Sequence, residues 1–256
     1  MTFETTRRYF IAVLTGLFLC CALFGIGWGW LFVPIAVFAV VLVYGSSCIG
    51  SQFFMATLCR ADSHEKQIAL TFDDGPHPEF TLDVLALLEE YGVLATFFVI
   101  GNHIHGNEGI LKKIDAAGHC IGNHSTTHGF FFDFKTLRGF QAELNQTSEL
   151  IYNVIGKQVA LFRPPYGVLT PQLARAIKRL KYTVIGWSVR SFDTAMPSAQ
   201  AIAKRVQAQI QPGAIILFHD TSGKTVLALK QTLEFAKDNG YKVVSVEQLL
   251  QINAYE

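Results

Sequence analysis

Acidic and histidine side chains follow several apolar runs of this sequence, at positions where they could do chemistry. Asp73 and Asp74 end one such run and precede a Gly-Pro turn. Taken alone, this pair indicates ordinary turn chemistry. His124 and His128 are four residues apart, and on a helix this spacing would place both within reach of one metal ion. Two histidines and one carboxylate leave open positions for water and substrate, which is typical of a hydrolytic metal centre.

Three further residues favour a catalytic interpretation of this set. If one aspartate binds the metal, its neighbour stays free as a base, and Arg163 could pair with that base and keep it ionised. His219 ends another apolar run and could protonate a leaving amine. The backbone N–H of Tyr166, together with the metal, could hold an oxyanion. The ligand types admit one divalent ion, zinc first, and also cobalt, nickel or manganese.

The elements that must position these residues are short strands and helices in alternation. Strands are predicted at 68–73, 95–100, 119–122, 161–163, 183–188, 214–219 and 242–246. Helical spacing of apolar residues predicts helices at 81–91, 135–155, 171–180, 198–209 and 225–239. This alternation predicts an α/β fold, a distorted (β/α) barrel of about seven parallel strands. In such a barrel the chemistry lies at the C-terminal ends of the strands.

Residues 1–59 predict a membrane anchor in front of this domain. Between Tyr9 and Cys59 there is no Asp, Glu, Lys, Arg or His. Because a helix needs about 20 apolar residues to cross a bilayer, the stretch suits two spans, at 10–27 and 31–48. A cleaved signal peptide has an apolar core of only about 7–15 residues and fits poorly. The less favoured alternative is a buried core hairpin. A linker at 60–66 and a globular domain at 67–253 would follow.

The sequence leaves the orientation of this anchor open. Arg7 and Arg8 favour a cytoplasmic N-terminus, and two spans would then return the domain to the cytoplasm. One span followed by an interfacial segment over 45–58 would place the domain outside. The net charge of +1 and the lack of basic patches argue against a nucleic-acid partner. The five cysteines form no paired motif and do not identify the compartment.

Five motifs in order, TFDDGP, HSTTH, RPPYG, WSVRSFDT and LFHD, resemble those of the polysaccharide deacetylases. These are carbohydrate esterase family 4, with the NodB-homology domain. The resemblance covers roughly residues 66–250 and identifies 67–253 as the catalytic domain. It implies a distorted (β/α) barrel and metal-dependent removal of N-acetyl, and sometimes O-acetyl, groups from glycans.

The resemblance also implies roles for single residues. By the family pattern Asp73 is the catalytic base, Arg163 tethers that base, and His219 is the catalytic acid. The backbone N–H of Tyr166 faces the acetate oxygen, and Leu217 forms the apolar wall beside the acetyl methyl group. The residues that match the metal ligands are Asp74, His124 and His128.

The fourth motif departs from the family pattern Asp-x-x-Asp-Trp. Arg190 occupies the position of the first aspartate and Thr194 that of the tryptophan, so that only Asp193 remains. An arginine beside His219 would lower the pKa of the catalytic acid. Either Asp193 takes over the partnership with His219, or Arg190 turns toward the substrate. Trp187, in the same motif, is a candidate substrate contact, although a tryptophan in a strand is more often core.

The leading hypothesis is a membrane-anchored N-deacetylase of glycans that contain N-acetylglucosamine, such as peptidoglycan or a chitin-like polymer. Two alternatives are a deacylase or deformylase of a lipid-linked sugar, and a catalytically inactive glycan-binding membrane protein. The expected location is the bacterial inner membrane, with the domain facing the cell envelope. The expected partners are the glycan and the lipid bilayer, with no obligate protein partner.

Overall fold

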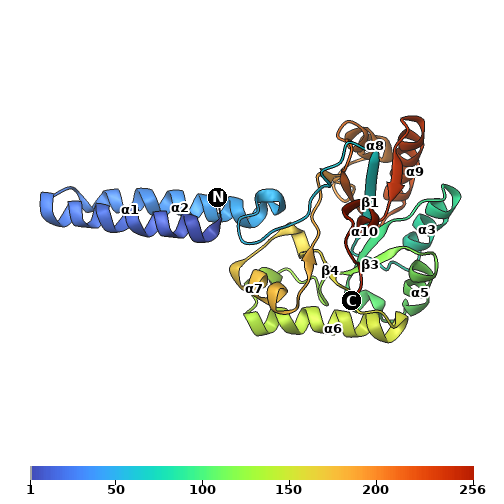
Figure 1. Cartoon of the computed structure of the whole chain (residues 1–256), viewed down its shortest axis with the longest axis horizontal. Helices are drawn as coiled ribbons and strands as arrows, with labels where there is room; N and C mark the ends of the chain where they lie inside the picture. The colour runs from blue at the N-terminus through green and yellow to red at the C-terminus, as the bar shows by residue number, and fades with distance from the viewer. Residues whose placement is uncertain (1) are drawn as a thin grey trace.

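A helical hairpin and an α/β domain make up the computed structural model, which describes residues 2–256 (Figure 1). Every strand pair of the sheet is parallel, in the order β5-β4-β3-β2-β1-β7-β6, with β8 beside the first half of β1. The strands are β1 (Gln67–Asp73), β2 (Thr96–Val99), β3 (Cys120–Asn123), β4 (Leu161–Phe162), β5 (Thr183–Val184), β6 (Val189–Arg190), β7 (Ile215–His219) and β8 (Lys242–Val244). The predicted distorted barrel is confirmed.

One chain segment forms both ends of the seven-strand path. β5 pairs with β4, β6 pairs with β7, and only residues 185–188 separate them. The single strand predicted over 183–188 is therefore wrong in its second half. The carbonyls of Ile185 and Gly186 accept hydrogen bonds from the Arg163 side chain instead of from a neighbouring strand, which interrupts the ladder.

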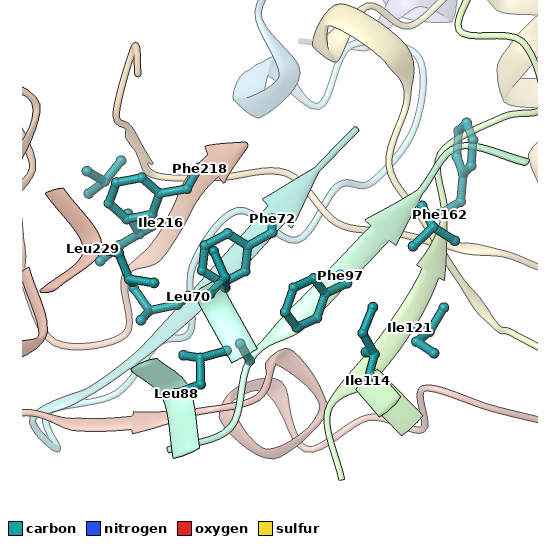
Figure 2. Close-up of a cluster of buried hydrophobic side chains, with 14 of the residues drawn as sticks. Leu70, Phe72, Leu88, Phe97, Ile114, Ile121, Phe162, Ile216, Phe218 and Leu229 are labelled. Carbon is teal, nitrogen blue, oxygen red and sulfur yellow. The ribbon is translucent and has the colours of Figure 1, made fainter. Parts of the chain in front are cut away.

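Helices cover the outer face of the sheet, and apolar side chains fill the space between. In Figure 2, Phe72, Phe97 and Phe218 come from three neighbouring strands and lie side by side, with Leu88 and Leu229 from two helices against them. The helices of the domain are α3 (Phe80–Glu90), α4 (Gly101–Ile104), α5 (Glu108–Ala116), α6 (Leu137–Ile155), α7 (Pro171–Arg179), α8 (Ala199–Gln207), α9 (Gly223–Asp238) and α10 (Val246–Leu250).

The alternation of β1 explains how this core and a polar site share one strand. Successive side chains of a strand point to opposite faces. Leu70 and Phe72 thus enter the core under the helices, whereas Thr71 and Asp73 point to the other face, where both contact Arg163.

The N-terminal hairpin consists of α1 (Phe3–Phe24), the short helix η1 (Trp28–Leu31) and α2 (Phe32–Ser47). α1 begins earlier than the predicted span because Thr2 caps it and Arg7 pairs with Glu4 in its first turns. Both helices are long and apolar enough to cross a membrane, and only 6% of either apolar window is buried. This exposure argues against the alternative of a buried core hairpin. The membrane anchor over 1–59 stays a prediction.

Residues 49–61, which include the start of the predicted linker, lie against the domain. The backbone of Leu58 accepts a hydrogen bond from the Gly186 N–H and donates one to the Val184 carbonyl, both at 2.9 Å, along the outer edge of β5. The Ala61 N–H bonds to the Gly213 carbonyl at 2.8 Å, just before β7. At the hairpin base, the Leu169 N–H donates to the Ser46 carbonyl at 3.0 Å. The domain limits at 59 and 66 stay predictions.

Candidate active site

Asp73, the last residue of β1, forms a buried ion pair with Arg163. The Arg163 guanidinium is 0% exposed and lies 2.7 Å from Asp73 Oδ1. It also donates to Thr71 Oγ1 and to the carbonyls of Ile185 and Gly186, at 2.8–3.1 Å. Because these partners satisfy it from three sides, Arg163 can hold the Asp73 carboxylate in one orientation. Asp73 Oδ2 is left facing His124 Nε2 at 3.7 Å.

Asp74, His124 and His128 converge on one point beside this pair. Asp74 Oδ1 lies 3.5 Å from Nε2 of each histidine, and the three candidate ligand atoms lie within 4.8 Å of one another. The Nδ1 atom of His124 is 2.7 Å from the Arg163 carbonyl, so its Nε2 faces the cluster. An outer partner of this kind fixes the orientation of a metal-binding histidine.

The two histidines do not share a helix. They flank an irregular turn in which Ser125 and His128 have positive φ values of 67° and 46°. The Ser125 N–H donates to the Asn123 side chain, and the His128 N–H donates to Ser125 Oγ. These local bonds replace the helical pattern, which is common for Asn and Ser.

The side chains of the cluster fit a divalent metal ion. Asp74 Oδ1 is buried and accepts no hydrogen bond from residues 2–256. An unpartnered buried carboxylate oxygen facing two imidazole nitrogens matches the donor set of zinc and related ions. Burial alone would raise the pKa of Asp74. Interaction with His124 and the charges of His128 and His219 outweigh burial and hold this pKa below its ordinary value, so that the carboxylate is ready to bind a cation.

His219, the last residue of β7, lies on the opposite side of this cluster. Its Nε2 is 4.0 Å from Asp74 Oδ2, and its Nδ1 is 2.7 Å from Asp193 Oδ1. The other oxygen of Asp193 accepts bonds from the His219 N–H and from Thr225 Oγ1. Burial alone would lower the pKa of His219, but the hydrogen bond and charge of Asp193 raise it to about 9.

Comparison with known proteins supports one family. The polysaccharide deacetylase model matches residues 60–185. The peptidoglycan-N-acetylglucosamine deacetylase PgdA of Listeria monocytogenes is 35% identical over 184 residues, which are 72% of this chain and 39% of that protein. The structure of the Bc1960 peptidoglycan N-acetylglucosamine deacetylase has a TM-score of 0.73 at 30% identity, covering 78% of this chain and 95% of that one. The chain belongs to the polysaccharide deacetylase family.

The fold of this family does not by itself show activity. BA3943, a family 4 pseudoenzyme from Bacillus anthracis, is similar as well, with a TM-score of 0.71 and 29% identity over 76% of this chain and 68% of that one. The chain also spans well under half the length of the Listeria relative. The function of this deacetylase-family chain therefore has to be argued from its site.

The structure shows where the residues of the altered fourth motif lie in this deacetylase-family chain. Asp193, which the sequence offers as one of two possibilities, bonds to His219, as described above. Arg190 is exposed on β6, with its guanidinium 4.8 Å from the Phe192 ring and 5.7 Å from the Trp187 ring. The structure thus places Arg190 among rim aromatics and leaves it free to contact a substrate.

The other predicted substrate contacts lie around the same opening. The Tyr166 ring is half exposed and packs edge-on against His128 at 4.6 Å, while its hydroxyl donates to the His128 carbonyl. Leu217 is buried on β7, two residues before His219. The Trp187 ring lies against Gly167, where a Cβ atom would come within 2.4 Å of it. Gly167 also has a φ of 71°, so both space and backbone require glycine there.

Two functional supports were missed by sequence reasoning. Glu143 of α6 accepts bonds from the N–H groups of Thr126 and Thr127 and from the Thr127 hydroxyl, and so holds the turn between the histidines. The signal in the sequence for Glu143 was a carboxylate among the apolar residues on the buried face of its helix. Asp220 is buried beneath the Gly75 turn and accepts a bond from the Thr81 hydroxyl. Burial raises its pKa to about 7.

Asp193→Asn is expected to move the alkaline limb of the pH–rate profile to lower pH. If His219 acts as an acid, activity is present below its pKa and is lost above it. Asp193 makes the largest contribution to raising that pKa to about 9, ahead of Asp73 and Asp74, so its neutralisation moves the limb toward the ordinary histidine value. The measurement is kcat/KM against pH. Asp83→Asn, which changes an exposed carboxylate on α3, is the control and should leave the limb in place. An unmoved limb in Asp193→Asn would show that His219 is not the group titrating there.

Proposed function

We propose that this chain is a membrane-anchored, metal-dependent deacetylase that removes N-acetyl groups from glycans containing N-acetylglucosamine. The observation that carries the proposal is the Asp73 carboxylate, fixed by Arg163 on one side and facing the Asp74–His124–His128 cluster on the other. A base beside a metal site, with a protonated histidine opposite, is the arrangement that hydrolysis of an amide requires.

In the proposed reaction Asp74, His124 and His128 hold the divalent ion, which supplies Lewis acidity toward water and the acetyl carbonyl. Asp73 takes a proton from the water whose oxygen attacks the carbonyl carbon. Arg163 keeps Asp73 ionised and aimed during this step. His219, protonated at neutral pH, donates its proton to the amide nitrogen as the C–N bond breaks. The products are acetate and the free amine of the sugar.

The substrate and location are supported by the relatives and by the hairpin. The Listeria and Bc1960 proteins are described as acting on N-acetylglucosamine of peptidoglycan, and we extend that substrate class to this chain. The two exposed apolar helices support anchoring in the inner membrane. The envelope side is proposed from the peptidoglycan substrate of the relatives, not from the helices. The alternative of an inactive glycan-binding protein is disfavoured, because base, acid and candidate ligands converge in one site.

Metal binding is expected to depend on the proposed ligands. Asp74→Asn and His128→Gln should each lower metal affinity by about 10-fold or more, because a three-ligand set tolerates no loss. Isothermal titration of the chelator-treated protein with Zn²⁺ measures this effect without requiring activity. His64→Gln is the matched control, since His64 is exposed in the segment before β1. Wild-type affinity in both ligand variants would contradict the assignment.

The experiment that tests the function is acetate release by the full chain in detergent. N-acetylglucosamine oligomers and peptidoglycan fragments are each supplied with and without added Zn²⁺. Metal-dependent release from either substrate supports the deacetylase. No release from a metal-loaded protein would move the substrate to a lipid-linked or O-acetylated sugar. No release together with no bound metal would favour the inactive glycan-binding protein.

A further inference from the structure

Three phenylalanines close to the active site in the sequence are largely exposed. Phe130, Phe131 and Phe134 are 82%, 72% and 83% exposed, although Phe132 between them is fully buried. The rings of Phe130 and Phe131 meet edge to face with their centroids 5.1 Å apart, and the centroid of Phe131 lies 6.5 Å from that of Phe134. Single exposed apolar residues are ordinary, but a cluster of large ones indicates an interaction surface. We call residues 130–134 the Phe loop.

The Phe loop is part of the active-site rim. It begins two residues after the candidate metal ligand His128. The hydroxyl of Tyr166 donates to the His128 carbonyl, and Asp133 of the loop is close enough to raise the pKa of Tyr166 together with burial and Asp74. A surface that docks this loop therefore also faces the opening of the site.

The same rim carries the base of the hairpin. Leu169, three residues after Tyr166, bonds to the Ser46 carbonyl at the end of α2. Figure 1 shows α7 and the N-terminal end of α6, which follows the Phe loop, on the side of the domain that faces the hairpin. A bilayer that contains α1 and α2 would thus lie against this side.

Charges around the hairpin base fit an anionic lipid surface. Arg175 and Lys178 of α7 line a groove against the first residues of α1, together with Glu4. Arg179 and Arg8 are exposed nearby. Glu4, the acidic residue that lines this groove, is paired with Arg7. Basic residues next to a span are attracted to anionic headgroups, and aromatic side chains favour the interface.

We propose that the Phe loop inserts into the interfacial region of the same bilayer that holds the hairpin. This second attachment sets the catalytic opening against the membrane surface. The site then receives N-acetylated sugars that are linked to a membrane lipid, in preference to soluble oligomers. The substrate part of this inference rests on the proposed deacetylase function, whereas the insertion of the loop does not.

The test uses the full chain in nanodiscs of zwitterionic and anionic phospholipids. A diazirine-bearing phenylalanine is introduced at position 130, 131 or 134, and the photoproducts are identified by mass spectrometry. Tyr152 is the matched control, because it is an exposed aromatic on α6, away from the N-terminal end of this helix. We expect lipid adducts at the three loop positions to exceed those at position 152 by about 10-fold. Equal lipid labelling at all four positions would overturn the proposal. Photoproducts at the loop positions that contain only added glycan oligomers, and no lipid, would overturn it as well.

A second measurement separates this inference from the proposed function. The variant Phe130→Ser/Phe131→Ser/Phe134→Ser is compared with wild type on soluble N-acetylglucosamine oligomers and on an N-acetylglucosaminyl lipid in the same nanodiscs. We expect turnover of the lipid substrate to fall by about 10-fold and turnover of the oligomers to change by less than about 2-fold. Equal losses on both substrates would overturn the role in lipid-substrate presentation. If wild type turns over neither substrate, the proposed function fails, while the labelling still decides whether the loop is inserted.

Discussion

Asp73→Asn is expected to lower kcat by about 10²–10⁴-fold, the range typical of a lost general base. Asparagine has the shape of aspartate but cannot take the proton from the attacking water. The binding of metal should persist, because Asp74, His124 and His128 are untouched. The measurement is steady-state acetate release alongside Zn²⁺ titration of the same protein.

The matched control for the base is Asp83→Asn, which neutralises an exposed carboxylate on α3. It should change kcat by less than about 3-fold, as is usual for groups outside the reacting atoms. Loss of metal binding in Asp73→Asn would instead indicate that Asp73 is a ligand. Unchanged kcat with metal bound would remove Asp73 from the proposed mechanism.

Arg163→Met is expected to lower the free energy of unfolding of the domain by about 3–5 kcal/mol. The substitution leaves the buried Asp73 carboxylate without its cation. It also removes the donors to the carbonyls of Ile185 and Gly186, where the sheet path closes. Denaturation of the full chain in detergent, followed by tryptophan fluorescence, reports the loss.

Two comparison variants test the cause of that loss. Arg190→Met removes an exposed arginine and should change the free energy of unfolding by about 0.5 kcal/mol or less. Asp73→Leu combined with Arg163→Met should recover part of the loss, because a buried apolar pair avoids the uncompensated charge. A change below about 1 kcal/mol in Arg163→Met would show that the buried pair contributes little to stability.

The sequence predicts well that the carboxyl ends of the strands lie together. The strands of a parallel sheet all end at the same edge, whatever the conformation of the loops. Asp73 and His219 could therefore be placed together from strand periodicity alone. The spacing of His124 and His128 predicted convergence correctly but for the wrong reason. Local bonds of Asn123 and Ser125, and the distant Glu143, decide that geometry, and such contacts leave no periodic signal.

The sequence could not decide which residue pairs with His219, and it could not give the conformation of residues 183–190, for a related reason. From sequence spacing, Asp193 and Arg190 were both candidates for the position beside His219. Only the tertiary fold turns Asp193 toward β7 and Arg190 toward the rim. The break between β5 and β6 depends on Arg163, which lies on a different strand end. Long-range side-chain contacts of this kind override the local preference for a continuous strand.

The pairing of Leu58 with the outer edge of β5 bears on how the domain behaves without its hairpin. An uncovered strand edge offers free N–H and C=O groups to other chains and promotes self-association. A protein cut to begin at residue 61 loses the Leu58 backbone and exposes the Val184 carbonyl and the Gly186 N–H. One cut directly after α2 keeps that cover. The segment that follows the helical hairpin thus also protects the sheet against edge-to-edge association.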